Sequence, residues 1–99
     1  MTDDLAAELI TSVDALKVRV FPSERSMAMD AADHAAGVLQ AAVAARGQAR
    51  VILATGNSQR AFVAALAGRA DIDWTKVVVF HMDEYLGVDR DNPGGLGHW

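Results

Sequence analysis

Residues 77–87, with the sequence VVVFHMDEYLG, constrain the fold of this chain more than any other feature. The apolar start of the segment is typical of a strand buried in a sheet. Two adjacent carboxylates, Asp83 and Glu84, follow at its C-terminal end together with Tyr85. In open parallel α/β sheets, ligands bind just beyond the C-terminal ends of the strands. The segment therefore predicts an α/β fold with polar chemistry at one edge of a sheet.

Two further segments have strand patterns. Residues 50–54 are almost continuously apolar, like residues 76–82. Such continuous apolar runs predict strands that are covered on both faces, as in a parallel sheet. Residues 16–21 alternate apolar with basic side chains, which is the period of a half-exposed strand. The sequence thus predicts three strands.

Helical patterns separate these strands. An apolar stripe of helical period runs over residues 24–46, with Ser23 as the expected N-cap and Gly47 as the expected C-cap. Residues 59–67 form a second, shorter helical pattern. Alternation of strand and helix predicts a parallel βαβαβ unit, half of a three-layer Rossmann-like α/β domain. Residues 3–12 predict a short N-terminal helix, and Trp74 is expected to pack under the sheet.

The composition excludes several classes of function. The chain has 99 residues, a net charge of −4 and no block of Lys or Arg, so it suits one small domain that does not bind nucleic acid. No apolar stretch reaches the ~20 residues of a membrane span, and the acidic N-terminus lacks a secretory signal pattern. The absence of cysteine fits a cytoplasmic protein. No pair of histidines has metal-ligand spacing, so no metal is expected.

A tight turn, Thr55-Gly56-Asn57-Ser58, lies between a predicted strand and a predicted helix. Unpaired amide N–H groups at a helix N-terminus attract phosphate, glycine lets the backbone approach the ligand, and the hydroxyls add donors. The alternative is a plain turn in which Asn57 or Ser58 only caps the helix. The turn matches neither a Walker loop nor a dinucleotide-binding fingerprint.

The acidic segment also has two interpretations. A carboxylate at the mouth of a parallel sheet can move protons, bind a hard cation or cap a turn. The alternative is that Asp83 caps a turn, Glu84 is solvated and Tyr85 packs. The two loops follow strands of one sheet, so they are expected at the same edge, which favours a site for a phosphorylated substrate. His81, within the last strand, is interpreted as a packed residue.

These two segments together resemble the glucosamine-6-phosphate deaminase/isomerase family, whose wider relatives include 6-phosphogluconolactonase and ribose-5-phosphate isomerase. The resemblance lies in Leu-Ala-Thr-Gly-Asn-Ser at 53–58, in residues 73–77 running into 80–87, and in Asp-Asn-Pro at 91–93. Met-Asp-Glu-Tyr points to the deaminase branch, because the lactonases carry an Asp-Glu-Arg type of sequence there. Asn57-Ser58-Gln59 departs from the Ser-Thr-Pro that is commoner in the deaminases.

The resemblance implies roles for these residues. Thr55, Gly56, Asn57 and Ser58 would bind the phosphate of the substrate. Asp83 would take a proton from C2 of an open-chain amino sugar phosphate and return it at C1, giving fructose 6-phosphate and ammonia. Glu84 would act beside it in the catalytic site, and Tyr85 would hold substrate hydroxyls. No metal or organic cofactor is implied.

The resemblance also implies a shortened chain, because full-length relatives are more than twice as long. Residues 1–93 are interpreted as the N-terminal half of the domain and residues 94–99 as an aberrant glycine-rich tail. We expect the isolated chain to be marginally stable and nearly inactive, and to form a homo-oligomer or to need a complementing second half. A non-catalytic phosphosugar-binding module and a 6-phosphogluconolactonase-like hydrolase are the alternatives.

Overall fold

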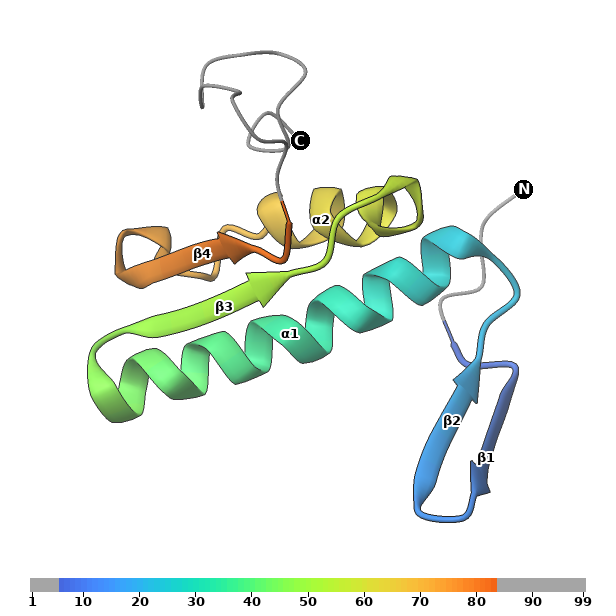
Figure 1. Cartoon of the computed structure of the whole chain (residues 1–99). Helices are drawn as coiled ribbons and strands as arrows, with labels where there is room; N and C mark the ends of the chain where they lie inside the picture. The colour runs from blue at the N-terminus through green and yellow to red at the C-terminus, as the bar shows by residue number, and fades with distance from the viewer. Residues whose placement is uncertain (1–5, 84–99) are drawn as a thin grey trace.

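The computed structural model describes residues 6–83. Strands and helices alternate along most of this range, as Figure 1 shows, which confirms the predicted α/β class with strand–helix–strand units. The elements are β1 (Leu9–Val13), β2 (Leu16–Val20), α1 (Glu24–Arg46), β3 (Ala49–Leu53), α2 (Arg60–Ala67) and β4 (Val77–His81), with short 3-10 helices η1 (Asn57–Gln59) and η2 (Trp74–Lys76).

Helix α1 has the ends that the sequence predicts. At its N-terminus the backbone N–H of Ser26 donates to the Ser23 hydroxyl at 3.0 Å, and the Ser26 hydroxyl lies 3.3 Å from the Ser23 N–H, which completes a capping box. At its C-terminus Gly47 takes the left-handed conformation with φ 76° and donates to the Val43 carbonyl. These caps satisfy backbone groups that the helix itself leaves unpaired.

Strands β3 and β4 form the predicted parallel pair, in a register that places Leu53 beside His81. Both helices cover the same face of this pair, and the core lies between them and the sheet. Its buried residues are Ala32, Ala36, Leu39, Ala49, Leu66 and Ile72, and Trp74 packs against them as predicted. Half of these residues are alanines, so the core is small.

The opposite face of the parallel pair is open among the described residues. Ile52 and Phe80 alternate with the core-facing residues and are 64% and 51% exposed. The prediction that these strands are covered on both faces is therefore wrong for the described part of the chain. The reason is that α1 and α2 pack against each other, which places both on one side.

The N-terminal elements differ from prediction. Instead of a helix over residues 3–12, Leu9–Val13 forms strand β1, which pairs antiparallel with β2 through a two-residue turn where Asp14 has φ 53°. The β-branched residues of this segment favour a strand, and aspartate tolerates the left-handed conformation. β2 is a strand as predicted, but it lies in this hairpin and does not join the parallel sheet (Figure 1). An ion pair between Arg19 and Asp30, at 2.8 Å, links the hairpin to α1.

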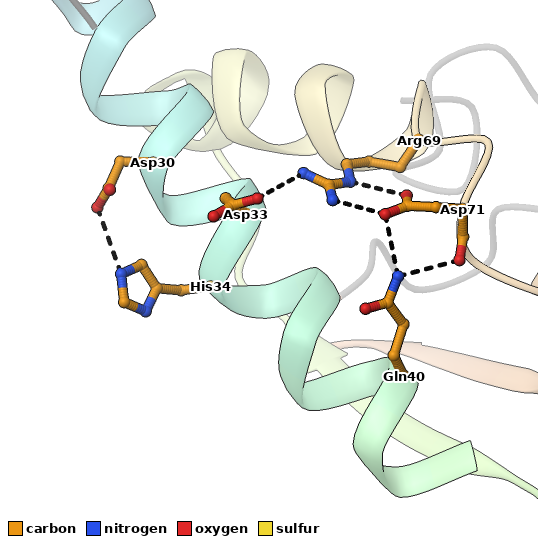
Figure 2. Close-up of polar contacts among 6 residues, drawn as sticks. All are labelled: Asp30, Asp33, His34, Gln40, Arg69 and Asp71. Atoms are coloured by element: carbon orange, nitrogen blue, oxygen red, sulfur yellow. Dashed lines mark hydrogen bonds and ion pairs between the residues drawn. The ribbon is translucent and has the colours of Figure 1, made fainter. Parts of the chain in front are cut away.

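A polar cluster around Arg69 joins α1 to the connection between α2 and β4 (Figure 2). The Arg69 guanidinium contacts Asp71 at 2.7 Å and Asp33 of α1 at 3.0 Å, and the Gln40 amide donates to both the side chain and the carbonyl of Asp71 at 3.0 Å. The indole N–H of Trp74 donates to the Arg69 carbonyl at 3.2 Å. The cluster thus fixes the chain that leads into β4.

Replacing Asp71 by asparagine is expected to destabilise the protein at neutral pH but not in acid. The hydrogen bonds from Arg69 hold the pKa of Asp71 at about 2, below the ~3.9 of an unfolded aspartate. Ionised Asp71 therefore contributes stability above pH ~4, and this contribution is lost as the pH falls toward 2. Urea unfolding from pH 7 to pH 2 should show the two proteins converging. The prediction is contradicted if the difference in unfolding free energy between the original protein and Asp71→Asn stays constant with pH. It is also contradicted if the control variant Glu8→Gln shows the same pH-dependent convergence.

Candidate functional site

The two polar loops meet at the C-terminal edge of the parallel pair. Thr55 follows β3 after one residue, and Asp83 follows β4 after one residue. The Thr55 hydroxyl donates a hydrogen bond to Oδ1 of Asp83, and the Met82 N–H donates to the Leu53 carbonyl at 2.9 Å. The prediction that both loops lie at one sheet edge is confirmed.

The backbone of the first loop requires glycine. Gly56 has φ 105° and ψ 164°, a region that is essentially restricted to glycine. The 3-10 helix η1 begins directly after it, where the Gln59 N–H donates to the Gly56 carbonyl at 3.1 Å. An added Cβ at Gly56 would meet no atom within 4 Å. The glycine is therefore needed for its backbone conformation, and not because neighbouring atoms crowd it.

The capping alternative for this loop does not hold. The residue that caps α2 is Gln59, and neither α2 nor η1 has a side-chain cap hydrogen bond. Asn57 and Ser58 are both exposed. Because their side chains do not serve as caps, they remain available at the surface beside the Gly56 turn.

Asp83 is exposed, and Thr55 beside it is half-buried. The hydrogen bond from Thr55 engages Oδ1, while Oδ2 accepts no hydrogen bond from the residues in 6–83. His81 is exposed, and it lines a cavity of about 170 Å³ between the sheet and α2 together with Val51, Leu66 and Trp74. Its exposure does not support the prediction that it is a packed residue.

Sequence reasoning missed a contribution from the start of α1. A cavity of about 330 Å³ is lined by Ser58 and Gln59 of the loop and by Glu24 and Met27 of α1. α1 runs antiparallel to β3, so its first turns lie at the same edge as the C-terminal ends of the strands. That topology is the signal that places Glu24 near the loop.

Several predicted residues lie outside the described part of the chain, among them Glu84, Tyr85 and the segments 91–93 and 94–99. Within residues 6–83, no group of three or more His, Cys, Asp or Glu side chains is placed to hold a metal ion. None of the helices in the same range combines the length and apolarity of a membrane span.

Comparisons with known proteins cover both loops. The model of a family described as glucosamine-6-phosphate isomerases/6-phosphogluconolactonase matches residues 22–94. A 6-phosphogluconolactonase of Pseudomonas putida is 40% identical over 84 residues, which are 83% of this chain and 34% of that protein. A 6-phosphogluconolactonase of Mycobacterium tuberculosis is 37% identical over 76 residues, 75% of this chain and 31% of that protein. The chain thus spans about a third of the length of these relatives.

Proposed function

Because the chain belongs to the glucosamine-6-phosphate isomerase/6-phosphogluconolactonase family, we propose that it binds a six-carbon sugar phosphate at the edge where Thr55 and Asp83 meet. The loop from Thr55 to Ser58 holds the phosphate through its backbone N–H groups and hydroxyls. Asp83 acts on the sugar as a general base. The observation that carries this proposal is the hydrogen bond from Thr55 to Asp83, which couples the phosphate loop to the carboxylate.

The substrate that the relatives favour is 6-phosphogluconolactone, since the matched proteins are named 6-phosphogluconolactonase. This compound is a cyclic ester, which opens when water adds to the carbonyl carbon and the ring C–O bond breaks. A carboxylate next to the ring can take the proton of the attacking water and return it to the ring oxygen that leaves. Asp83 suits this task because it is exposed and Thr55 orients its Oδ1 oxygen.

Amino-sugar phosphate deamination is the second candidate, and one observation favours it. The sequence Met-Asp-Glu-Tyr at 82–85 resembles the deaminases more than the lactonases. In this reaction Asp83 moves a proton from C2 to C1 of glucosamine 6-phosphate, water adds at C2, and ammonia leaves from C2 to give fructose 6-phosphate. Release of ammonia from glucosamine 6-phosphate, without hydrolysis of the lactone, would replace the first candidate by this one.

The Asp83→Asn variant tests the role of the carboxylate. Asparagine keeps an oxygen that accepts the Thr55 hydrogen bond, so we expect 6-phosphogluconate to bind within about twofold of its original affinity. Lactone hydrolysis should fall by about 10² to 10⁴, the usual contribution of a general base. Calorimetric titration and a lactonase assay measure the two quantities.

Two controls make that test specific. Asp14→Asn makes the same exchange in the hairpin turn, away from the sheet edge, and should change neither quantity. Gluconate, which lacks the phosphate, should bind more than about tenfold more weakly than 6-phosphogluconate. Turnover that is unchanged in Asp83→Asn overturns the base assignment. If both the original protein and Asp83→Asn bind 6-phosphogluconate but neither hydrolyses the lactone, the enzymatic proposal is overturned and the phosphosugar-binding module is favoured.

A further inference from the structure

The N-terminal edge of the parallel pair, opposite the phosphate loop, carries a second polar cavity. It has a volume of about 380 Å³ and is lined, among the described residues, by the exposed Arg46, Gln48 and Arg50. Arg46 ends α1, and Arg50 belongs to β3. β3 is five residues long, so at ~3.3 Å per residue the cavity lies roughly 16 Å from the loop at its other end.

The lining of this cavity is rich in hydrogen-bond donors. The Nε–H of Arg50 donates to Oε1 of Gln48 at 3.3 Å, which uses one of the two acceptor positions of that oxygen, and the Gln48 NH₂ group adds two donors. No carboxylate is among the described residues that line the cavity, and no ion pair of Arg46 or Arg50 occurs within the described range. Two guanidinium groups, neither of them ion-paired with a residue in 6–83, therefore face one space in a chain whose net charge is −4.

We propose that this cavity binds a small phosphate dianion, either free or as a phosphate monoester. Guanidinium groups present paired N–H donors that match two phosphate oxygens at once. The cavity volume of about 380 Å³ is within the range of small-molecule sites. Lys76, the last residue of η2, directly precedes the neighbouring strand β4 at the same edge. Its partner Asp73, at 4.0 Å, also accepts a hydrogen bond from the Thr75 N–H. The site is independent of the proposed phosphate loop.

NMR titration of the ¹⁵N-labelled chain with inorganic phosphate tests this proposal, with NaCl used to keep the ionic strength constant. We expect saturating shifts at the amides of residues 46–50 and at the Nε–H signals of Arg46 and Arg50. In the double variant Arg46→Gln/Arg50→Gln these shifts should require at least tenfold more phosphate. A parallel titration with 6-phosphogluconate distinguishes the two sources, because tighter binding of the ester assigns the site to a monoester.

A matched control separates a site from general electrostatics. Arg25→Gln, at the other end of α1, also removes an arginine charge and should leave the affinity at residues 46–50 unchanged. An equal loss in Arg25→Gln, or the same shifts with chloride alone, overturns the proposal. Shifts confined to residues 55–58 overturn it as well, while they support the phosphate loop.

Discussion

Replacing Leu66 by alanine is expected to lower the free energy of unfolding by about 2 to 5 kcal/mol, the range for leucine-to-alanine changes in cores. Leu66 is 3% exposed and is one of only two leucines in the buried cluster, beside Leu39. The other buried residues are mostly alanines, which cannot move to fill the space. Small domains have about 5 to 15 kcal/mol of stability in total, so this one change should remove much of it.

The matched control for this prediction is Leu16→Ala, which deletes the same atoms from a side chain that is 65% exposed. Its effect should stay within about 0.5 kcal/mol, as is usual for surface positions. Urea unfolding followed by circular dichroism gives both values. Equal effects of the two substitutions would show that the cluster around Leu66 is not the stabilising core.

The parts of the fold that follow from local chemistry were predictable. Ser23 and Gly47 mark the ends of α1 because capping depends on a few neighbouring atoms, and these ends are confirmed. The parallel pairing of β3 and β4 follows from the continuous apolar runs and the helix between them. By contrast, the partner of β2 depends on which strand reaches it in space, and nothing within residues 16–21 specifies that partner.

The candidate site was also predictable only in part. Its position at the C-terminal edge of the sheet was predictable, because the loops that follow parallel strands lie at one edge of a sheet. The hydrogen bond between Thr55 and Asp83 was not, because it depends on the register that sets Leu53 beside His81. A shift of register by one residue would turn the side chains of one strand to the opposite face. Glu24 was also missed, since its approach to the loop depends on how α1 packs.

Replacing Gly56 by valine is expected to weaken sugar-phosphate binding at the loop from Thr55 to Ser58. The φ of 105° at this residue is an outlier for any β-branched side chain, so the loop must change its backbone conformation. The strain costs about 1 to 3 kcal/mol. A loop that has moved no longer directs its N–H groups at the phosphate, and we expect the affinity for 6-phosphogluconate to fall more than tenfold, which corresponds to a loss above about 1.4 kcal/mol.

Gly47→Val separates this loss of binding from a loss of stability. Gly47 also has a positive φ, of 76°, and an added Cβ there also meets no atom within 4 Å, but it lies at the end of α1 that is away from the loop. Both variants should therefore unfold at lower temperature, and only Gly56→Val should lose the 6-phosphogluconate shifts at the amides of residues 55–58, measured by NMR below its melting point. Retained affinity in Gly56→Val would exclude its loop as the phosphate site, because the backbone N–H groups that define that site cannot survive the change of conformation.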